Sequence, residues 1–156
     1  MTREFDGAGS GAGLKIGIVV SSFSSFITDK LLEGALKALK ENEVAEADIT
    51  IVRVPGSFEI SITAKKLISS GDYDALVGLG AIIKGETAHF DVLSTEVIRS
   101  ISNLSQASGV PICFGVITAL NSDQALNRAG GDKGNRGYEA GLAAVHMGIL
   151  SKKLDT

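Results

Sequence analysis

The feature that most constrains the fold of this chain is a regular alternation of short apolar runs with longer segments of helical periodicity. Four runs rich in Val, Ile and Leu predict buried strands, at residues 14–20, 48–54, 74–83 and 111–118. Apolar residues at helical spacing predict helices that follow these strands, at residues 25–41, 57–69, 87–108, 122–129 and 135–151. Strands that alternate with helices are typical of βαβ units, which build a parallel sheet.

The predicted strands are nearly continuous hydrophobic runs, as in a sheet that is covered on both faces. The sequence therefore predicts an α/β fold, a three-layer α/β/α sandwich with a four-stranded parallel sheet, flavodoxin-like in outline. Residues 14–156 are expected to form one domain, which suits a chain of 156 residues. Residues 1–6 are either a short extra strand or a frayed end, and the GAGSGAG run at residues 7–13 is typical of a flexible spacer.

Composition excludes several classes of protein. The single cysteine, Cys113, excludes an intramolecular disulfide framework and a CxxC zinc site. The net charge of −3 and the pI of about 5.4 leave no basic footprint for nucleic acid. No apolar run approaches the roughly 18 residues of a membrane span, and residues 1–15 lack the apolar segment of a secretory signal. We therefore expect a soluble cytoplasmic protein.

The carboxyl ends of the predicted strands are the expected location of a ligand site. In open α/β sheets, ligands bind outside these ends, in the loops that lead to the helices. This rule selects four loops, at residues 21–23, 55–59, 83–89 and 118–122. Polar residues are sparse in these loops, so each of them is a candidate for function.

His89 is one of two histidines, and it lies where a strand leads into a predicted helix. Because a helix N-terminus disfavours the imidazolium cation, a neutral His89 can act as a base or proton shuttle. Capping and packing are its other interpretations. The second histidine, His146, has apolar neighbours in the last predicted helix, and we expect it to be structural.

Residues 80–87 nearly match the phosphate-binding P-loop motif, but Glu86 stands where the motif requires Lys. A carboxylate at that position opposes a triphosphate, which argues against nucleotide hydrolysis. A weaker inference survives, because Gly85 to Thr87 lead into a helix N-terminus. Free backbone N–H groups and the Thr87 hydroxyl would suit a single phosphate there.

Three further residues have both a structural and a functional interpretation. Arg128 precedes a glycine turn, so it either stabilises a helix end through the dipole or closes on a phosphate as a fork. Glu59 is an ordinary first-turn acid, yet together with Ser57 it can bind a polyol chain. Phe23, at a strand exit, is either part of the core or a stacking surface for a planar ring.

Four blocks of sequence carry a resemblance to a known family. They are VRVPGSFEI (52–60), GAIIKGETAHFD (80–91), FGVIT (114–118) and RAGGDKGNRGYEA (128–140). In this order and spacing they resemble the 6,7-dimethyl-8-ribityllumazine synthase family, over about residues 14–150. That family condenses 5-amino-6-(D-ribitylamino)uracil with 3,4-dihydroxy-2-butanone 4-phosphate, releasing phosphate and water, in the penultimate step of riboflavin biosynthesis. The resemblance implies a transferase that needs no metal or other cofactor.

The resemblance also implies roles for individual residues. His89 would be the catalytic proton-transfer residue. The substrate-binding residues near the pyrimidine and ribityl chain would be Phe23, which stacks on the ring, Ser57, Phe58 and Glu59, which hold the chain and ring edge, and Ala81, Ile82 and Ile83, which line the ring through their backbone.

The remaining residues implied by the resemblance belong to the phosphate end and to a neighbouring subunit. Glu86 and Thr87 would meet the phosphate together with Arg128. Phe114 would come from the neighbouring subunit and cover the ring, with Arg136 and Glu139 nearby. The family usually has Arg-Phe-Asn after the first strand, where this chain has Ser22-Phe23-Ser24, so we expect altered pyrimidine contacts and the same reaction.

Family members assemble as pentamers, and the resemblance implies a homo-oligomer. The segment GGDKGNRG, between the last two predicted helices, is short and glycine-rich as in members that form icosahedral shells. We therefore expect a 60-subunit shell, with a lone pentamer or decamer as the alternatives. Residues 1–6 would pair with the sheet edge of a neighbour. The expected partners are small-molecule substrates and riboflavin synthase, with no nucleic acid and no membrane.

Two other functions are consistent with parts of the sequence. A flavodoxin-like FMN carrier would purify yellow and show no condensation activity. A shell protein that has lost catalysis would form an intact particle and make no product, although it would have no use for His89, Arg128 and Glu59. A receiver-like signalling domain is disfavoured, because residues 14–22 offer no acidic cluster at the strand end.

Overall fold

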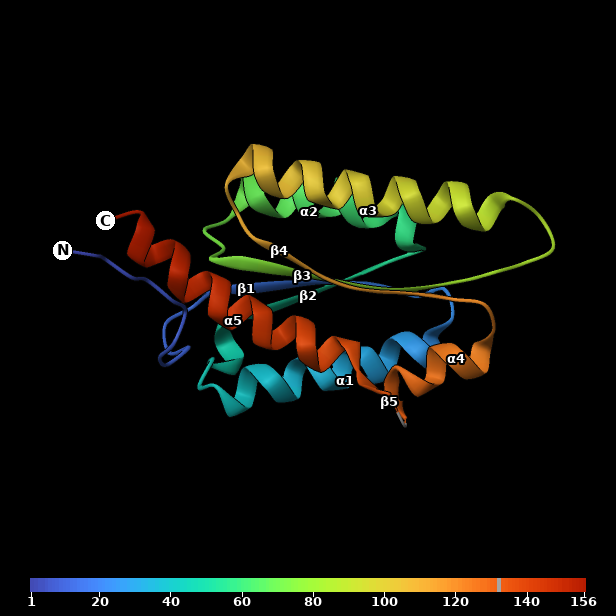
Figure 1. Ribbon diagram of the computed structural model, residues 1–156, viewed down its shortest axis with the longest axis horizontal. Helices are drawn as coiled ribbons and strands as arrows, with labels where there is room; N and C mark the ends of the chain where they lie inside the picture. Colours follow the sequence, from blue (N-terminus) through green and yellow to red (C-terminus); the bar gives the residue numbers. More distant parts are fainter. Residues whose placement is uncertain (132) are drawn as a thin grey trace.

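The computed structural model describes residues 1–131 and 133–156, and its centre is a parallel sheet with the strand order β2-β1-β3-β4 (Figure 1). The strands are β1 (Ile16–Ser21), β2 (Ile49–Val54), β3 (Ala75–Ile83) and β4 (Ile112–Ala119). Each lies within two residues of the predicted bounds at both ends. All neighbouring strands pair in parallel, which confirms the predicted α/β sandwich of flavodoxin-like order.

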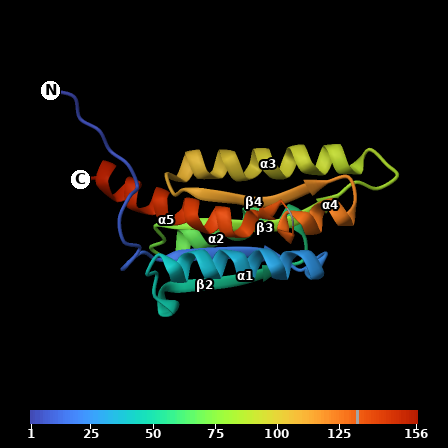
Figure 2. The ribbon, with the colours of Figure 1, turned by 60° about the horizontal axis from the view of Figure 1, so that its bottom comes forward.

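Helices cover both faces of the sheet (Figures 1 and 2). The helices are α1 (Ser25–Glu41), α2 (Ile60–Ser70), α3 (His89–Ser108), α4 (Ser122–Asn127) and α5 (Arg136–Leu154), with 3₁₀ turns η1 (Glu46–Asp48) and η2 (Ser57–Glu59). The pair α2 and α3 lies on one face, and α1, α4 and α5 lie on the other. Within the described residues, no helix is long and apolar enough to cross a bilayer.

The core is divided by the sheet, because successive side chains of a strand point to opposite faces. In β1, Ile16, Ile18 and Val20 are buried in the cluster beneath α1 and α5. Val19 instead belongs to the cluster beneath α2 and α3. This alternation determines which side chains at the carboxyl end of the sheet face α2 and α3.

The GAGSGAG run is packed against the domain, so its interpretation as a flexible spacer is wrong. Gly7 is buried, and a Cβ atom on it would collide with the backbone of His146 in α5. Gly11 is also buried and donates its N–H to the carbonyl of Asn42 at 2.8 Å. Lys153 Nζ donates to the carbonyl of Asp6 at 2.9 Å. Gly7 and Gly11 therefore allow close approach, whereas Gly9 and Gly13 adopt positive φ values that favour glycine.

The start of α2 and the end of α4 differ from the prediction for local reasons. Residues 57–59 form the 3₁₀ turn η2, and the Ser57 side chain makes no capping hydrogen bond to α2. α4 ends at Asn127, and residues 129–131 and 134–135 form the short antiparallel strands β5 (Ala129–Gly131) and β6 (Gly134–Asn135). Gly130 lies within β5 with a φ of 110°, a backbone conformation that favours glycine. Asp132, in the block 128–140, lies outside the described residues.

Candidate active site

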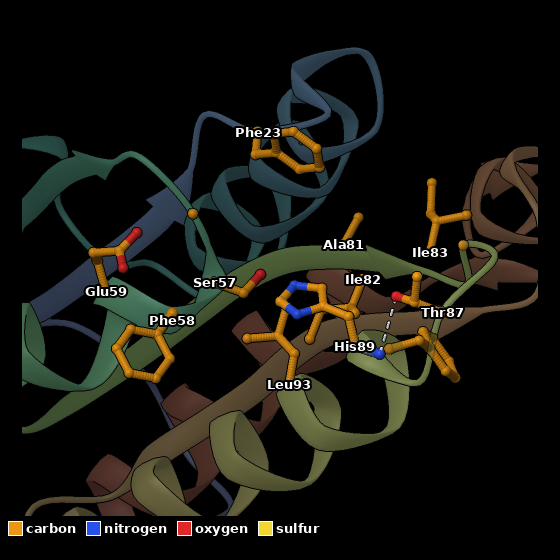
Figure 3. Close-up of a pocket in the computed structure, with 13 residues that line it drawn as sticks. Phe23, Ser57, Phe58, Glu59, Ala81, Ile82, Ile83, Thr87, His89 and Leu93 are labelled. Atoms are coloured by element: carbon orange, nitrogen blue, oxygen red, sulfur yellow. Dashed lines mark hydrogen bonds between the residues drawn. The ribbon is translucent and has the colours of Figure 1, made fainter.

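A pocket of about 490 Å³ opens at the carboxyl edge of the sheet, where the sequence predicted a ligand site (Figure 3). The chain brings together loops from three strand ends, those of β1, β2 and β3. The lining residues are Phe23, Gly56, Ser57, Phe58, Glu59, Ala81, Ile82, Ile83, Gly85, Thr87, His89, Phe90 and Leu93. Eight residues expected at the pyrimidine and ribityl end, counting His89, are therefore neighbours in space.

Two exposed aromatic rings stand on the same side of the molecule as the pocket. Phe23 follows β1 and is 71% exposed, and Phe58 in η2 is 62% exposed. Figure 3 shows both rings at the rim, with Ser57 and Glu59 close to Phe58. An exposed aromatic face is costly in water and favours a planar partner, so these residues suit a flat heteroaromatic ligand.

Ser57 is held deep in the pocket by a glycine of the central strand. Its residue surface is 7% exposed, and a Cβ atom on Gly80 of β3 would collide with Ser57 Oγ. The hydroxyl has no hydrogen-bond partner in the part of the chain that the structure describes. A buried hydroxyl that faces a pocket is a group for a polar ligand to satisfy.

The loop from β3 to α3 presents His89 to the pocket. His89 is the first residue of α3, two residues later than predicted, and Figure 3 shows its imidazole projecting inward from that first turn. Its backbone N–H donates to Thr87 Oγ1 at 3.3 Å. The Thr87 hydroxyl thus accepts a hydrogen bond from one backbone N–H of the predicted anion site. Its own proton can still be donated to an acceptor.

The two residues of the pocket that the sequence analysis missed are Phe90 and Leu93. Both are half-buried and pack against the core cluster beneath α2 and α3. Leu93 follows His89 by four residues, so the two side chains share one face of α3. That spacing was visible in the sequence and would have identified Leu93.

Three of the remaining predicted residues line a second pocket, of about 380 Å³, along β4. They are Phe114, Arg128 and Arg136, and this second pocket shares no lining residue with the first. Arg128 ends α4, and its Nη1 donates to the carbonyl of Gln124 at 3.2 Å. The side chain of Arg128 therefore contacts the end of α4, as its helix-end interpretation predicts. Most of its N–H donors stay available to a ligand.

Glu86 and Glu139 line neither pocket. Glu86 is exposed on the β3–α3 loop, between the pocket-lining residues Gly85 and Thr87. Glu139 lies beside the second pocket through its ion pair with Arg136, at 2.6 Å between Oε2 and Nη1. The structure thus divides the predicted site residues between two separate surfaces of one chain.

Nucleophilic and metal chemistry find little support in the described residues. Burial raises the pKa of the Cys113 thiol to about 11, which keeps it protonated and unreactive at neutral pH. No three His, Cys, Asp or Glu side chains gather as a metal-ligand set within residues 1–131 and 133–156.

Fold and pocket together define an α/β protein with a candidate ligand pocket at the carboxyl edge of its sheet. The family model of 6,7-dimethyl-8-ribityllumazine synthase matches residues 13–152. The chain therefore belongs to the lumazine synthase family of transferases, which implies lumazine synthase activity in riboflavin biosynthesis.

Proposed function

We propose that this protein condenses 5-amino-6-(D-ribitylamino)uracil with 3,4-dihydroxy-2-butanone 4-phosphate to 6,7-dimethyl-8-ribityllumazine, in the cytoplasm. The observation that carries the proposal is the joint placement of Phe23, Ser57, Glu59 and His89 around one pocket. These residues come from three different strand ends. Such a gathering supplies an aromatic face, groups for a polyol and a proton carrier within one cavity.

The pyrimidine and its side chain occupy the end of the pocket near β1 and η2. Phe23 and Phe58 offer ring faces, and the Ala81–Ile83 backbone runs along the pocket floor. Ser57 and Glu59 meet the ribityl hydroxyls, because a hydroxyl and a carboxylate are suitable partners for a polyol. This end of the pocket determines which amine is presented to the second substrate.

The reaction joins the two substrates in several steps, each of which requires a proton transfer. The ring amine attacks the ketone and forms an imine with loss of water, phosphate leaves, the enol tautomerises, and ring closure releases a second water. His89 transfers protons at these steps from the first turn of α3. Holding two reactants together supplies most of the acceleration, which fits a pocket with few ionisable groups.

The phosphate end of the site is completed by a second copy of the chain. Thr87 is in the first pocket, whereas Arg128, Arg136 and Phe114 line the separate pocket along β4. We place the β4 pocket of one subunit against the first pocket of its neighbour, so that Arg128 closes on the phosphate held at Gly85 and Thr87. The Arg128 guanidinium then acquires an anionic partner, whereas Arg136 already pairs with Glu139 within its own chain.

The test is to mix the two substrates and to follow the fluorescence of the lumazine product. We expect a rate well above that of the spontaneous reaction. His89→Ala should lower kcat roughly 10- to 100-fold and no further, since positioning remains intact. His146→Ala is the matched control, because His146 is the only other histidine and lines neither of the two pockets.

Two outcomes would contradict these assignments separately. A wild-type protein that forms no product above the spontaneous rate would rule out the proposed reaction. A His89→Ala variant as fast as wild type would leave the reaction in place and remove the role given to His89. A yellow protein with bound FMN and no product would instead favour the flavin-carrier alternative.

A further inference from the structure

The hydroxyl of Ser21, the last residue of β1, is buried without a hydrogen-bond partner. Ser21 is 0% exposed, and its Oγ has no partner among the described residues. Leaving a hydroxyl unsatisfied in an apolar environment costs about 1–3 kcal/mol. Native proteins rarely tolerate such a group without a function or a bound water.

The register of the sheet places Ser21 directly under the pocket. Val20 pairs with Leu79 of β3, so Ser21 and Gly80 are the next residues along these two strands. Val19 belongs to the core beneath α2 and α3, so Ser21, two residues later, points to that same face. On its other side Ser21 pairs with Val54, the last residue of β2.

The chain that leaves β2 passes over Ser21 to reach the pocket. It starts at Val54, beside Ser21, and by Ser57 it has reached Gly80, which lies on the opposite side of β1. η2 accordingly contacts both β1 and β3. Ser57 is 7% exposed and lines the pocket. The buried, partnerless hydroxyl of Ser21 and the hydroxyl of Ser57 therefore lie on one face of the sheet, at the base of the pocket.

We propose that Ser21 is a positioning residue for the pocket, whose buried hydroxyl shares an ordered water with Ser57 and so fixes the direction in which Ser57 presents its hydroxyl to the ribityl chain. No described protein atom forms a hydrogen bond with Ser21 Oγ, and the proposed water would satisfy this hydroxyl. The inference rests on the proposed function for the identity of the ligand. The link between the two serines does not depend on that identity.

The experiment is a double-mutant cycle of Ser21→Ala and Ser57→Ala. Each single variant should raise KM for the ribitylaminouracil about three- to tenfold, the value of one hydrogen bond, with kcat within about twofold. The double variant should be no worse than either single one, because both changes remove the same hydrogen bond to the substrate. Calorimetric titration with the ribitylaminouracil alone should show the same non-additive loss of affinity without any turnover.

Thr28→Val is the matched control. Thr28 lies on α1, beneath the other face of the sheet, and its hydroxyl is equally buried and also without a partner in the described residues. Its removal should leave KM and ligand affinity unchanged and should add independently to Ser57→Ala. A Ser21→Ala variant with wild-type KM and affinity, or additive effects of the two serine variants, would overturn the proposal.

The failure of this proposal can be distinguished from failure of the proposed function. If wild type neither binds the ribitylaminouracil nor forms product, the proposed function fails. The link between the serines is then judged from urea unfolding of the same four proteins. Non-additive shifts of the unfolding midpoint support the shared water, and additive shifts contradict it.

Discussion

At the scale of single residues, the backbone next to Phe23 adopts an unusual conformation. Ser24 has φ of 59° and ψ of 47°, the left-handed conformation, and directly precedes α1. This region is sterically unfavourable for serine, whereas Asn tolerates it better because its side chain forms local hydrogen bonds. The Ser24 side chain also makes no capping hydrogen bond. The family residue Asn therefore suits this backbone better than the Ser that this chain carries.

Replacing Ser24 by Asn should stabilise the fold. The expected gain is about 0.5 to 1 kcal/mol in the free energy of unfolding, from relief of the left-handed strain and a better capping side chain. Urea unfolding of wild type and Ser24→Asn measures it. Ser22→Asn is the control, since Ser22 is also exposed and has no positive φ. Equal effects at the two positions would show that the backbone conformation is irrelevant.

At the scale of elements, the tightest contact is that between α1 and α5. A Cβ atom on Gly137 would collide with the backbone carbonyl of Leu31, and one on Gly141 would lie 2.9 Å from the carbonyl oxygen of Ala35. Small residues on one side thus let the two helices approach at backbone distance. The second helix of this pair, α5, begins at Arg136, which lines the β4 pocket.

Gly137→Ala should therefore destabilise the protein, although alanine is the better helix former. In an open helix the same change gains about 1 kcal/mol, whereas overpacking against a rigid backbone costs about 1–3 kcal/mol. Gly148→Ala is the control, because its nearest neighbours are the Leu14 methyl carbons at 3.3 Å, which can move. Thermal unfolding of both variants tests the contrast, and a stabilised Gly137→Ala would refute the close approach.

Most elements were predictable because their periodicity is local. The β-branched runs and the helical spacing of residues 25–41 are patterns among neighbouring residues, and α1 has the predicted bounds. The predictions that were wrong depended on tertiary contacts. The burial of Gly7 depends on His146, far away in sequence, and no local pattern reveals that a glycine-rich run lies against a helix. Residues 57–59 were expected to open a helix, but they form the turn η2, and the Ser57 hydroxyl lies against Gly80 of β3.

The site was predictable to the extent that a topological rule selects its loops. Phe23, Glu59 and His89 all follow predicted strands, so the carboxyl-edge rule expects them near one another, and they do share a pocket. Leu93 was missed, because it lies one turn into α3 and so beyond the loops that the rule selects. The support given by Ser21 could not be predicted, since it depends on strand register and on the path of the chain from Val54 to Ser57.

At the scale of the whole molecule, the division into two pockets becomes the dominant feature. Phe114 is 41% exposed on β4, and Arg128 and Arg136 line the cavity beside it. A ring of identical subunits is heterologous, so each subunit presents one surface to the left and a different one to the right. The first pocket and the β4 pocket are those two surfaces in our proposal. Twelve five-membered rings of this kind would form a 60-subunit shell, the assembly that the short segment 130–137 favours. Sedimentation of the purified protein measures which assembly forms.

The composite site predicts that two impaired variants restore each other. His89→Ala damages only the first pocket, and Arg128→Ala damages only the β4 pocket. In rings refolded from an equal mixture, an intact site needs an Arg128→Ala subunit on one side and a His89→Ala subunit on the other. Random assembly makes about one quarter of all sites intact, so the mixture should recover about that fraction of wild-type activity.

Refolding each variant alone provides the baseline, and mixing the variants without refolding controls for subunit exchange. If both pockets acted within one chain, no mixed ring would contain an intact site, and the activity of the mixture would equal the mean of the two variants. Refolding His89→Ala with the double variant His89→Ala/Arg128→Ala must also give no recovery, because every subunit then lacks the imidazole. Recovery in the first mixture and not in the second requires that His89 and Arg128 reach the same substrate from different subunits.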